Sequence, residues 1–222
     1  MSAANTHPVV LRTNPVKKAR SKSNIVRSTI DVKTWRARCP SVDEVRPGQC
    51  PQCAAASRPV GRALQIWGHG LRDRQQRGPL EPLGEPVEIT IRVRRYVCRV
   101  CRAVLVVVPL GVLAGRLFGA AAIGLAVALF GVGQLPMAAV RRRVSPWQHV
   151  GASAQGSWLS LRRWVHAIRA RRLFASVRPA PPHCTARALA ARAAQTLAAL
   201  APPSLAAAAV EPRVFAGAVR AR

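Results

Sequence analysis

The sequence predicts an α+β fold in which a small β zinc ribbon is followed by an all-α unit of three helices. Two cysteine pairs, Cys50–Cys53 and Cys98–Cys101, flank segments with the two-residue periodicity of strands. After Arg116 the apolar residues recur at the three-to-four-residue spacing of helices. The three helices are expected to resemble a helix-turn-helix unit, and both termini are expected to be disordered.

The two cysteine pairs have the spacing of a structural zinc site. Two residues between two thiolates let both sulfurs bind one metal ion, and two such pairs complete a tetrahedral shell. We therefore expect one structural Zn²⁺ held by Cys50, Cys53, Cys98 and Cys101. A ribbon over residues 39–110 would use the metal in place of a core too small to be stable alone.

Other readings of the cysteines find less support in the sequence. A redox pair would need a βαβ unit, and a disulfide framework would need an oxidising compartment. The first ten residues carry no apolar secretory signal, so a cytoplasmic location is expected. Cys39 and Cys184 have no partner at ligand spacing and are expected to be free thiols.

Within the ribbon, period-2 patterns predict strands on both sides of a loop rich in glycine and proline at 70–86. The expected strands are residues 62–68, 87–97 and 103–108. On the polar face of the second strand, Arg92, Arg94 and Tyr96 form a basic and aromatic row. Such a row can pair with phosphates and stack on a base, or it can be a solvated strand face.

Helical periodicity predicts a second domain at 114–173. Its expected helices are residues 118–130, 136–144 and 157–173. If the third helix enters a DNA major groove, its polar stripe is expected to reach base edges, and a basic run on the second helix is expected to hold phosphates. The stripe residues are Arg162, Arg163, His166 and Arg169, and the basic run is Arg141, Arg142 and Arg143.

The charge of the chain favours a polyanionic partner. Its 222 residues include 35 Lys and Arg against 8 Asp and Glu, a formal net charge of +27. Nucleic acid is the expected partner, with duplex DNA as the first candidate. RNA shares the same charge argument. Beyond Glu88 only Glu211 remains acidic, so the second half cannot assemble catalytic carboxylates. We expect a binding protein and no enzyme.

The two ends of the chain are expected to lack a packed core. Residues 1–38 carry all four lysines and read as a basic disordered tail. Residues 174–222 are rich in alanine and proline and are expected to hold one helix, at 185–200.

A membrane span is the alternative from another functional class. Residues 117–140 hold no charged side chain, and arginines flank both ends of the segment. The glycines, Gln134 and Pro136 within it favour a buried helix pair instead.

The order of cysteine pairs, basic strand and helices resembles the N-terminal DNA-recognition region of bacterial insertion-sequence transposases. The residues that carry it are Cys50, Cys53, Cys98 and Cys101, the helix at 120–129 and the Ser160–Val165 segment with its arginines and tryptophan. The resemblance implies recognition of duplex DNA by a zinc ribbon and a helix-turn-helix unit. The DDE nuclease domain of that family has no counterpart here, so transposition activity is not implied.

Overall fold

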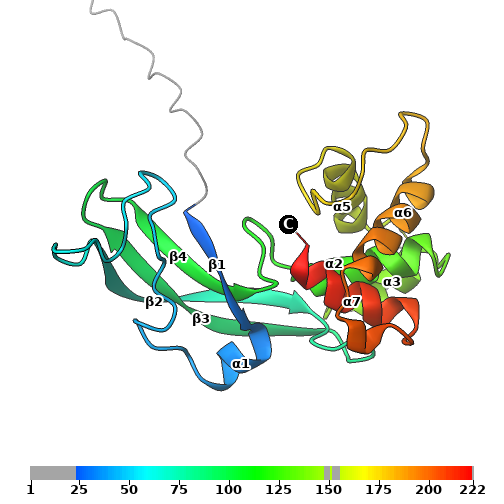
Figure 1. The fold of residues 1–222 in the computed structure, drawn as a ribbon. Coiled ribbons are helices and arrows are strands. Elements are labelled where there is room, and N and C mark those ends of the chain that lie inside the picture. Colours follow the sequence, from blue (N-terminus) through cyan, green and yellow to red (C-terminus); the bar gives the residue numbers. More distant parts are fainter. Residues whose placement is uncertain (1–23, 148–150, 152–155, 222) are drawn as a thin grey trace, which may run out of the picture.

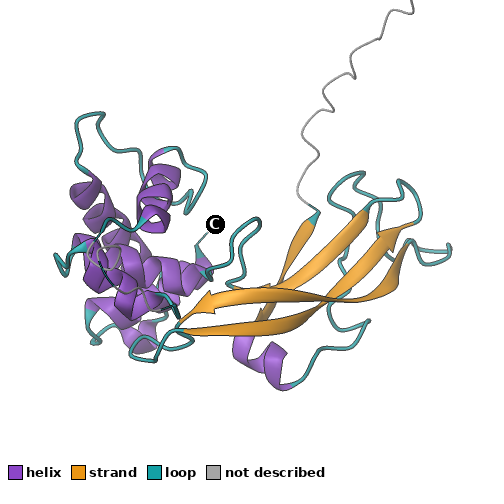
Figure 2. Ribbon diagram, turned by 180° about the vertical axis from the view of Figure 1, so that it is seen from behind, coloured by secondary structure: helices purple, strands orange, loops and turns teal. Residues whose placement is uncertain are grey.

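A four-stranded sheet lies beside a bundle of helices in the computed structural model, which describes residues 24–147, 151 and 156–221 (Figures 1 and 2). The mixed α+β class predicted from the sequence is confirmed. The strands are β1 (Ile25–Asp31), β2 (Ile66–Gly78), β3 (Val87–Cys98) and β4 (Val104–Leu110). Their order across the sheet is β1-β4-β3-β2, with β1 parallel to β4 and the other pairs antiparallel.

The prediction of a disordered tail at 1–38 is wrong for its second part. β1 runs parallel to β4 in register Ile25 with Val106, and the short helix α1 (Val32–Ala37) follows at once. The side chain of Asp31 starts this helix by accepting from the N–H groups of Lys33 and Thr34. Residues 1–23, with the remaining part of the basic tail, lie outside the described residues.

β2 is longer than predicted and replaces much of the expected loop at 70–86. It pairs with β3 over its whole length, with one irregularity between Gly68 and Leu71. Its sequence from Arg72 to Arg77 is polar and gives no strand signal alone. Pairing with the amphipathic β3 supplies the hydrogen bonds and the cross-strand contacts, so tertiary context decides this strand.

The sheet is buried on parts of both faces. One cluster near the cysteines is built around Trp35 of α1, Tyr96 of β3 and Leu105 of β4. A second cluster gathers Ile91 and Val93 of β3 with Val108 of β4. The indole Nε1 of Trp35 donates to the carbonyl of Arg92 at 2.8 Å, which ties α1 to the middle of the sheet.

The bundle is organised around one helix that is buried on almost every side. Its elements are α2 (Ala120–Gly131), α3 (Met137–Val144), α5 (Leu159–Arg169), α6 (Ala186–Ala199), the 3₁₀ turn η1 (Pro203–Leu205) and α7 (Val210–Arg220). In α2 every residue except Ala121 is buried. The uncharged stretch at 117–140 is therefore a core helix followed by a turn and α3. Among the described residues, no helix is long and apolar enough to cross a membrane.

α5 is shorter than the helix expected at 157–173. It begins at Leu159, and Trp158 precedes it without a side-chain cap, so Ser157 does not cap it. Its apolar positions Leu161, Val165 and Ile168 are buried as expected. Trp158 and Trp164 pack edge to face with a centroid distance of 4.9 Å, and Phe118 completes this aromatic cluster.

The C-terminal segment is part of the core, so the prediction of a tail at 174–222 with a single helix is wrong. α6 confirms the helix expected at 185–200, and α7 packs against both α2 and α6. Small residues allow this close approach: a Cβ added at Gly131 would meet the backbone nitrogen of Ala191 at 2.2 Å. A Cβ added at Gly217 would meet the carbonyl oxygen of Leu197 at 1.8 Å.

The sheet and the bundle are joined through backbone contacts at the end of β2. The N–H of Arg77 donates to Leu117 at 2.8 Å, and the N–H of Gly119 donates back to Arg77. Gly78 has φ +108°, and a Cβ there would meet Ala122 of α2 at 2.3 Å. These contacts fix the orientation of the bundle on the sheet.

Candidate metal centre and basic surface

The two cysteine pairs sit on turns with the same backbone geometry. In the first, the N–H of Cys50 donates to Ala55 and the N–H of Ala54 donates to Cys50. In the second, Cys98 donates to Ala103 and Arg102 donates to Cys98 in the same pattern. Ala54 and Arg102, four residues after the first cysteine of each pair, both adopt positive φ, 59° and 61°.

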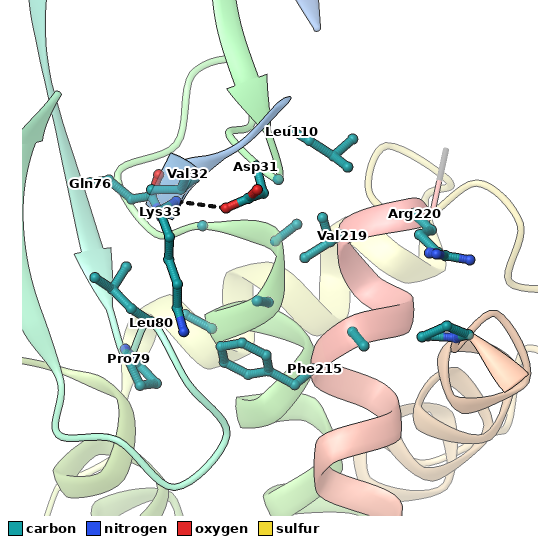
Figure 3. A pocket seen from close by; sticks show the side chains of 17 residues that line it. Asp31, Val32, Lys33, Gln76, Pro79, Leu80, Leu110, Phe215, Val219 and Arg220 are labelled. Carbon is teal, nitrogen blue, oxygen red and sulfur yellow. Dashed lines mark hydrogen bonds between the residues drawn. The ribbon is translucent and has the colours of Figure 1, made fainter. Parts of the chain in front are cut away.

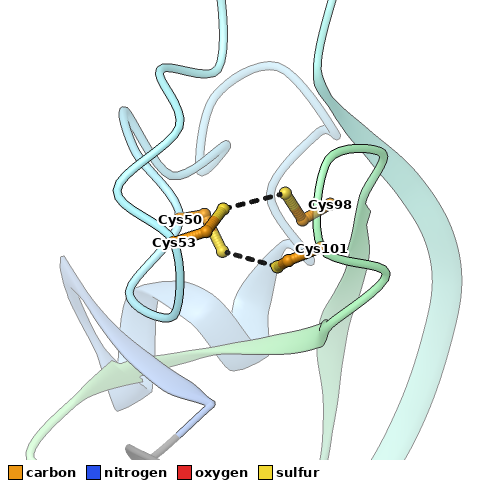
Figure 4. Close-up of side chains that lie close together, drawn as sticks. All are labelled: Cys50, Cys53, Cys98 and Cys101. Atoms are coloured by element: carbon orange, nitrogen blue, oxygen red, sulfur yellow. Dashed lines mark hydrogen bonds between the residues drawn. The ribbon is translucent and has the colours of Figure 1, made fainter.

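These turns bring the four sulfurs together, as Figure 4 shows. The Sγ atoms of Cys50 and Cys101 lie 3.7 Å apart, as do those of Cys53 and Cys98. All four sulfurs lie within 4.8 Å of one another. Four thiolates at about 2.3 Å from one tetrahedral zinc ion would be separated by about 3.8 Å. The cluster therefore suits one structural metal ion such as Zn²⁺.

Burial and hydrogen bonding distinguish the four thiols. Cys50 and Cys98 are buried, while Cys53 and Cys101 face solvent. Burial opposes ionisation of Cys50, but hydrogen bonds from the N–H groups of Cys53 and Gln52 outweigh it and lower the pKa of that thiol to about 7. At Cys101 a bond from the N–H of Ala103 is outweighed by burial and the neighbouring sulfurs, which raise its pKa to about 12.

The remaining cysteines lie outside this cluster. The thiol of Cys39 is directed at the carbonyl of Arg92 at 3.6 Å, and that of Cys184 at the carbonyl of Thr185 at 3.6 Å. Neither belongs to the four-sulfur group found among the described residues. Four cysteine ligands leave no open coordination position for a substrate water. A metal ion held by this cluster would therefore have a structural role.

The basic and aromatic row on β3 is interrupted by burial. Arg92 is exposed, but Arg94 is half-buried and its Nε donates to the carbonyl of Pro40 at 2.7 Å. Tyr96 is fully buried, and its hydroxyl donates to Val42 at 2.7 Å. Tyr96 therefore cannot stack on a base. The sequence pattern placed it with the polar residues of the strand and did not reveal that the segment after α1 folds over this face.

The basic run on α3 is also divided. Arg141 is buried, with 7% of its surface exposed, whereas Arg142 and Arg143 face solvent. Arg141 therefore belongs to the bundle interior and not to a phosphate-binding surface. Successive residues of a helix are turned by about 100° from one another, so three consecutive arginines do not share one face.

The polar stripe of α5 faces solvent as predicted. Arg162, Arg163 and His166 are exposed and line a hollow of about 500 Å³ together with Arg116 and Arg172. Arg169 has a different role, because its guanidinium donates to the carbonyls of Pro182 and Cys184 and holds the loop before α6.

This hollow adjoins two others that share Arg116, and we call the three together the Arg116 trough. The second hollow, about 490 Å³, lies against β1 and β2, and the third, about 170 Å³, lies against the residues after α5. The basic residues of the trough are Arg27, Arg72, Arg74, Arg116, Arg162, Arg163, His166, Arg171 and Arg172. Asp73 is the one carboxylate that lines it among the described residues.

A strand arginine positions the loop that carries Arg116. The guanidinium of Arg74 donates to the carbonyl of Leu113 at 2.6 Å and to that of Arg116 at 3.2 Å. Burial lowers the pKa of Arg74, and repulsion from Arg72 lowers it further. Burial likewise lowers the pKa of Arg116, with a smaller contribution from Arg172. The trough therefore concentrates positive charge that its own side chains do not neutralise.

Several of the described acidic residues form ion pairs outside the Arg116 trough. Among the described residues the ion pairs join Lys33 to Glu81, Arg38 to Glu44, Arg46 and Arg58 to Asp43, and Arg77 to Glu88. None of these includes a residue of the Arg116 trough.

Arg116 and Arg172 are functional candidates that the sequence did not single out. In the sequence Arg116 only flanks an uncharged segment, and Arg172 lies just beyond the polar stripe of the third predicted helix. Helical periodicity relates residues of one element, but it carries no information on a loop that folds across from another element.

Comparisons with protein-family models, with curated proteins and with solved structures found no match for this chain.

Proposed function

We propose that this protein is a zinc-stabilised, non-catalytic nucleic-acid-binding protein whose partner is duplex DNA. The observation that supports this proposal is the Arg116 trough. It gathers cationic side chains from the sheet, from the loop at 111–118 and from α5, with a single carboxylate along its length. Phosphate groups are the ligands that such a surface suits best, because arginine donates in a fork that matches two phosphate oxygens.

Within this proposal the two kinds of arginine have different roles. Arg162 and Arg163 project from an exposed helix face and would reach base edges if α5 enters the major groove. Arg116 and Arg172 lie beside them and would hold the flanking phosphates, which contribute affinity without sequence preference. A zinc ion in the cysteine cluster would stabilise the fold by holding β3 and β4 in place. The resemblance to transposase recognition regions is consistent with this arrangement.

The first test is the salt dependence of binding to a DNA duplex. Each phosphate that an arginine neutralises releases condensed counterion, so the slope of log K against log salt is about −0.9 per contact. Arg116→Ala and Arg172→Ala, which remove the proposed phosphate contacts, are each expected to reduce the slope by about one contact. Arg192→Ala serves as the matched control, because Arg192 is exposed on α6 and lies outside the trough. A flat salt response, or equal effects of all three variants, would contradict the proposal.

The second test asks whether α5 reads sequence. A preferred duplex sequence is selected with the wild type and with the two α5 variants Arg162→Ala and Arg163→Ala. Loss of a bidentate contact to guanine should cost about 1–3 kcal/mol of discrimination at one position. If both variants select the same sequence with equal discrimination, α5 is not the reading helix. Tighter binding of single-stranded RNA of equal length would exclude duplex DNA as the partner.

A further inference from the structure

One face of the sheet is partly open at the cysteine end. The register places Trp67 of β2 opposite Val97 of β3, and Arg95 of β3 opposite Val106 of β4. Directly paired residues lie on the same side of a sheet, and the side alternates along each strand, so these four residues share one face. Trp67 is 45% exposed, and the other three are half-buried. We call these four residues the Trp67 face.

The opposite face is closed at the same point of the sheet. There Tyr96 and Leu105 are fully buried, in one cluster with Trp35 of α1. The basic and aromatic row predicted on β3 lies on that closed face. Arg95 instead interrupts the apolar side of β3, where alternation continues from Val93. The sheet therefore exposes a tryptophan beside an arginine on the side that carries the valines.

The ring of Trp67 is held from two directions. Its indole Nε1 donates to the carbonyl of Leu64 at 2.7 Å, and the guanidinium of Arg99 lies over the ring, 4.5 Å from its centroid. The N–H of Arg99 donates to the carbonyl of Gln65, which ties the second cysteine turn to the start of β2. An exposed ring that is already oriented loses little freedom when a second ring stacks on it, so it is prepared for binding.

The charge around this ring is positive. Among the described residues, Arg72, Arg95 and Arg99 take part in no ion pair. Asp73 lies opposite Arg92 of β3, an arginine of the other face. Unpaired arginines beside an open aromatic ring complement a strand that carries both phosphates and bases.

The Trp67 face continues from the Arg116 trough. Val106 belongs to the face and also lines the second hollow of the trough, as does Arg72. Arg72 lies opposite Val93, which is four residues before Val97 on β3. Four residues of a strand span about 13 Å, so one short stretch of nucleic acid can contact both places.

The apolar pocket of about 330 Å³ between α1, α2 and α7 is a separate feature at the other end of β2 (Figure 3). Its unpartnered buried polar atom is the Oε1 of Gln76, which is an acceptor, and Lys33 in its lining is ion-paired with Glu81. These groups do not call for a phosphate. The path from the trough to Trp67 leads away from this pocket.

From this arrangement we infer that the Trp67 face binds a single-stranded stretch of DNA, with one base stacked on Trp67 and phosphates held by Arg72 and Arg95. The bases of a duplex are stacked on one another, so the ring can reach the face of a base only where a strand is unpaired. This inference rests on the proposed function, because the single strand is taken to leave the duplex that the Arg116 trough holds.

The test compares three probes that share one short DNA duplex. The first is the blunt duplex, the second carries a thymidine overhang, and the third carries an abasic overhang of equal length, which keeps the phosphates and lacks the bases. Overhangs are placed at either strand terminus in turn. We expect the thymidine overhang to bind about 5- to 100-fold more tightly than the abasic overhang, the range that stacking on an aromatic side chain provides.

Variants of exposed tryptophans show whether this ratio arises at the Trp67 face. Trp67→Ala is expected to bring the ratio to within about twofold of unity and to leave the affinity for the blunt duplex unchanged. Trp67→Phe keeps an aromatic ring and should retain part of the ratio. The matched control is Trp147→Ala, because Trp147 is also exposed and stacks on an arginine, with Arg77 3.7 Å from its ring centroid, at the bundle end of β2. It should keep the wild-type ratio.

The two proposals fail in different ways. Equal affinities for the thymidine and abasic overhangs, or an unchanged ratio in Trp67→Ala, would overturn the inference on the Trp67 face. An equal loss of the ratio in Trp147→Ala would overturn it as well. The blunt duplex reports on the Arg116 trough alone, so a failure to bind it would contradict the proposed function, whatever the ratio between the overhangs.

Discussion

At the scale of single residues, Cys98 joins the metal cluster to the sheet. It ends β3, is fully buried, and contacts the Sγ of Cys53 across the cluster. In Cys98→Ser we expect loss of the bound zinc and unfolding of the cysteine-bearing end of the sheet. Metal binding in small zinc domains supplies folding free energy on the order of 10 kcal/mol. Zinc content by elemental analysis and thermal melting provide the measurement.

The matched control is Cys184→Ser, which makes the same chemical change at a thiol outside the cluster. It should keep one zinc per chain and the wild-type melting temperature within about 1–2 °C. A Cys98→Ser protein with unchanged zinc content would contradict the assignment of the metal centre.

Substitution of Asp31 tests whether its side chain stabilises the start of α1. Hydrogen bonds from the side chain and N–H of Thr34 lower the pKa of Asp31 below its ordinary 3.8. Since the folded-state pKa is lowered, the contribution to stability is complete above the unfolded pKa and is lost only as pH falls through the folded value. Asp31→Ala should therefore cost about 1 kcal/mol of unfolding free energy, equally at about pH 6 and about pH 8.

Urea unfolding at the two pH values measures this difference. Asp73→Ala is the control, because Asp73 is an exposed aspartate whose carboxylate accepts no hydrogen bond from the described residues. If Asp31→Ala loses no more unfolding free energy than Asp73→Ala, the Asp31 cap does not stabilise α1.

At the scale of elements, α7 depends on the absence of side chains where it crosses α6. Gly217 lies so close to this helix that a Cβ would meet the carbonyl oxygen of Leu197 at 1.8 Å. Gly217→Ala is expected to destabilise the bundle by about 1–3 kcal/mol, because a backbone carbonyl cannot move aside as a side chain can. Chemical denaturation followed by helical circular dichroism is the measurement.

Gly48 offers the control for this substitution, since a Cβ added there meets nothing within 4 Å. Gly48→Ala should leave stability within about 0.5 kcal/mol of the wild type. Equal losses in the two variants would indicate that α7 is not packed as described.

At the scale of the whole molecule, the candidate metal centre and the helical core lie at different ends of the sheet. The four cysteines hold turns at one end of the sheet, and the bundle adjoins the other end of β2 and β3 (Figure 1). Removing zinc with a chelator should therefore broaden NMR signals at the cysteine end first, while those of α2, α6 and α7 persist. A simultaneous loss of both sets would show that zinc supports the entire fold.

The sequence by itself determined the features that local spacing encodes. Two matched Cys-x-x-Cys pairs predicted the metal cluster, because ligand spacing within a turn is a local property. Alternation predicted β3, and helical periodicity predicted α2, α3, α5 and α6 to within a few residues. The apolar positions of α5 were predicted correctly for the same reason.

The tertiary structure decided which of these surfaces remain exposed. Tyr96 and Arg141 read as surface residues in sequence, yet other segments or the bundle core cover them. β1, the polar half of β2 and α7 form because distant segments supply hydrogen bonds and apolar contacts that their own sequences do not indicate. Arg116 joins the arginines of α5 only because a loop from one element folds against another. Periodicity records the environment within an element, whereas a site between elements depends on long-range packing.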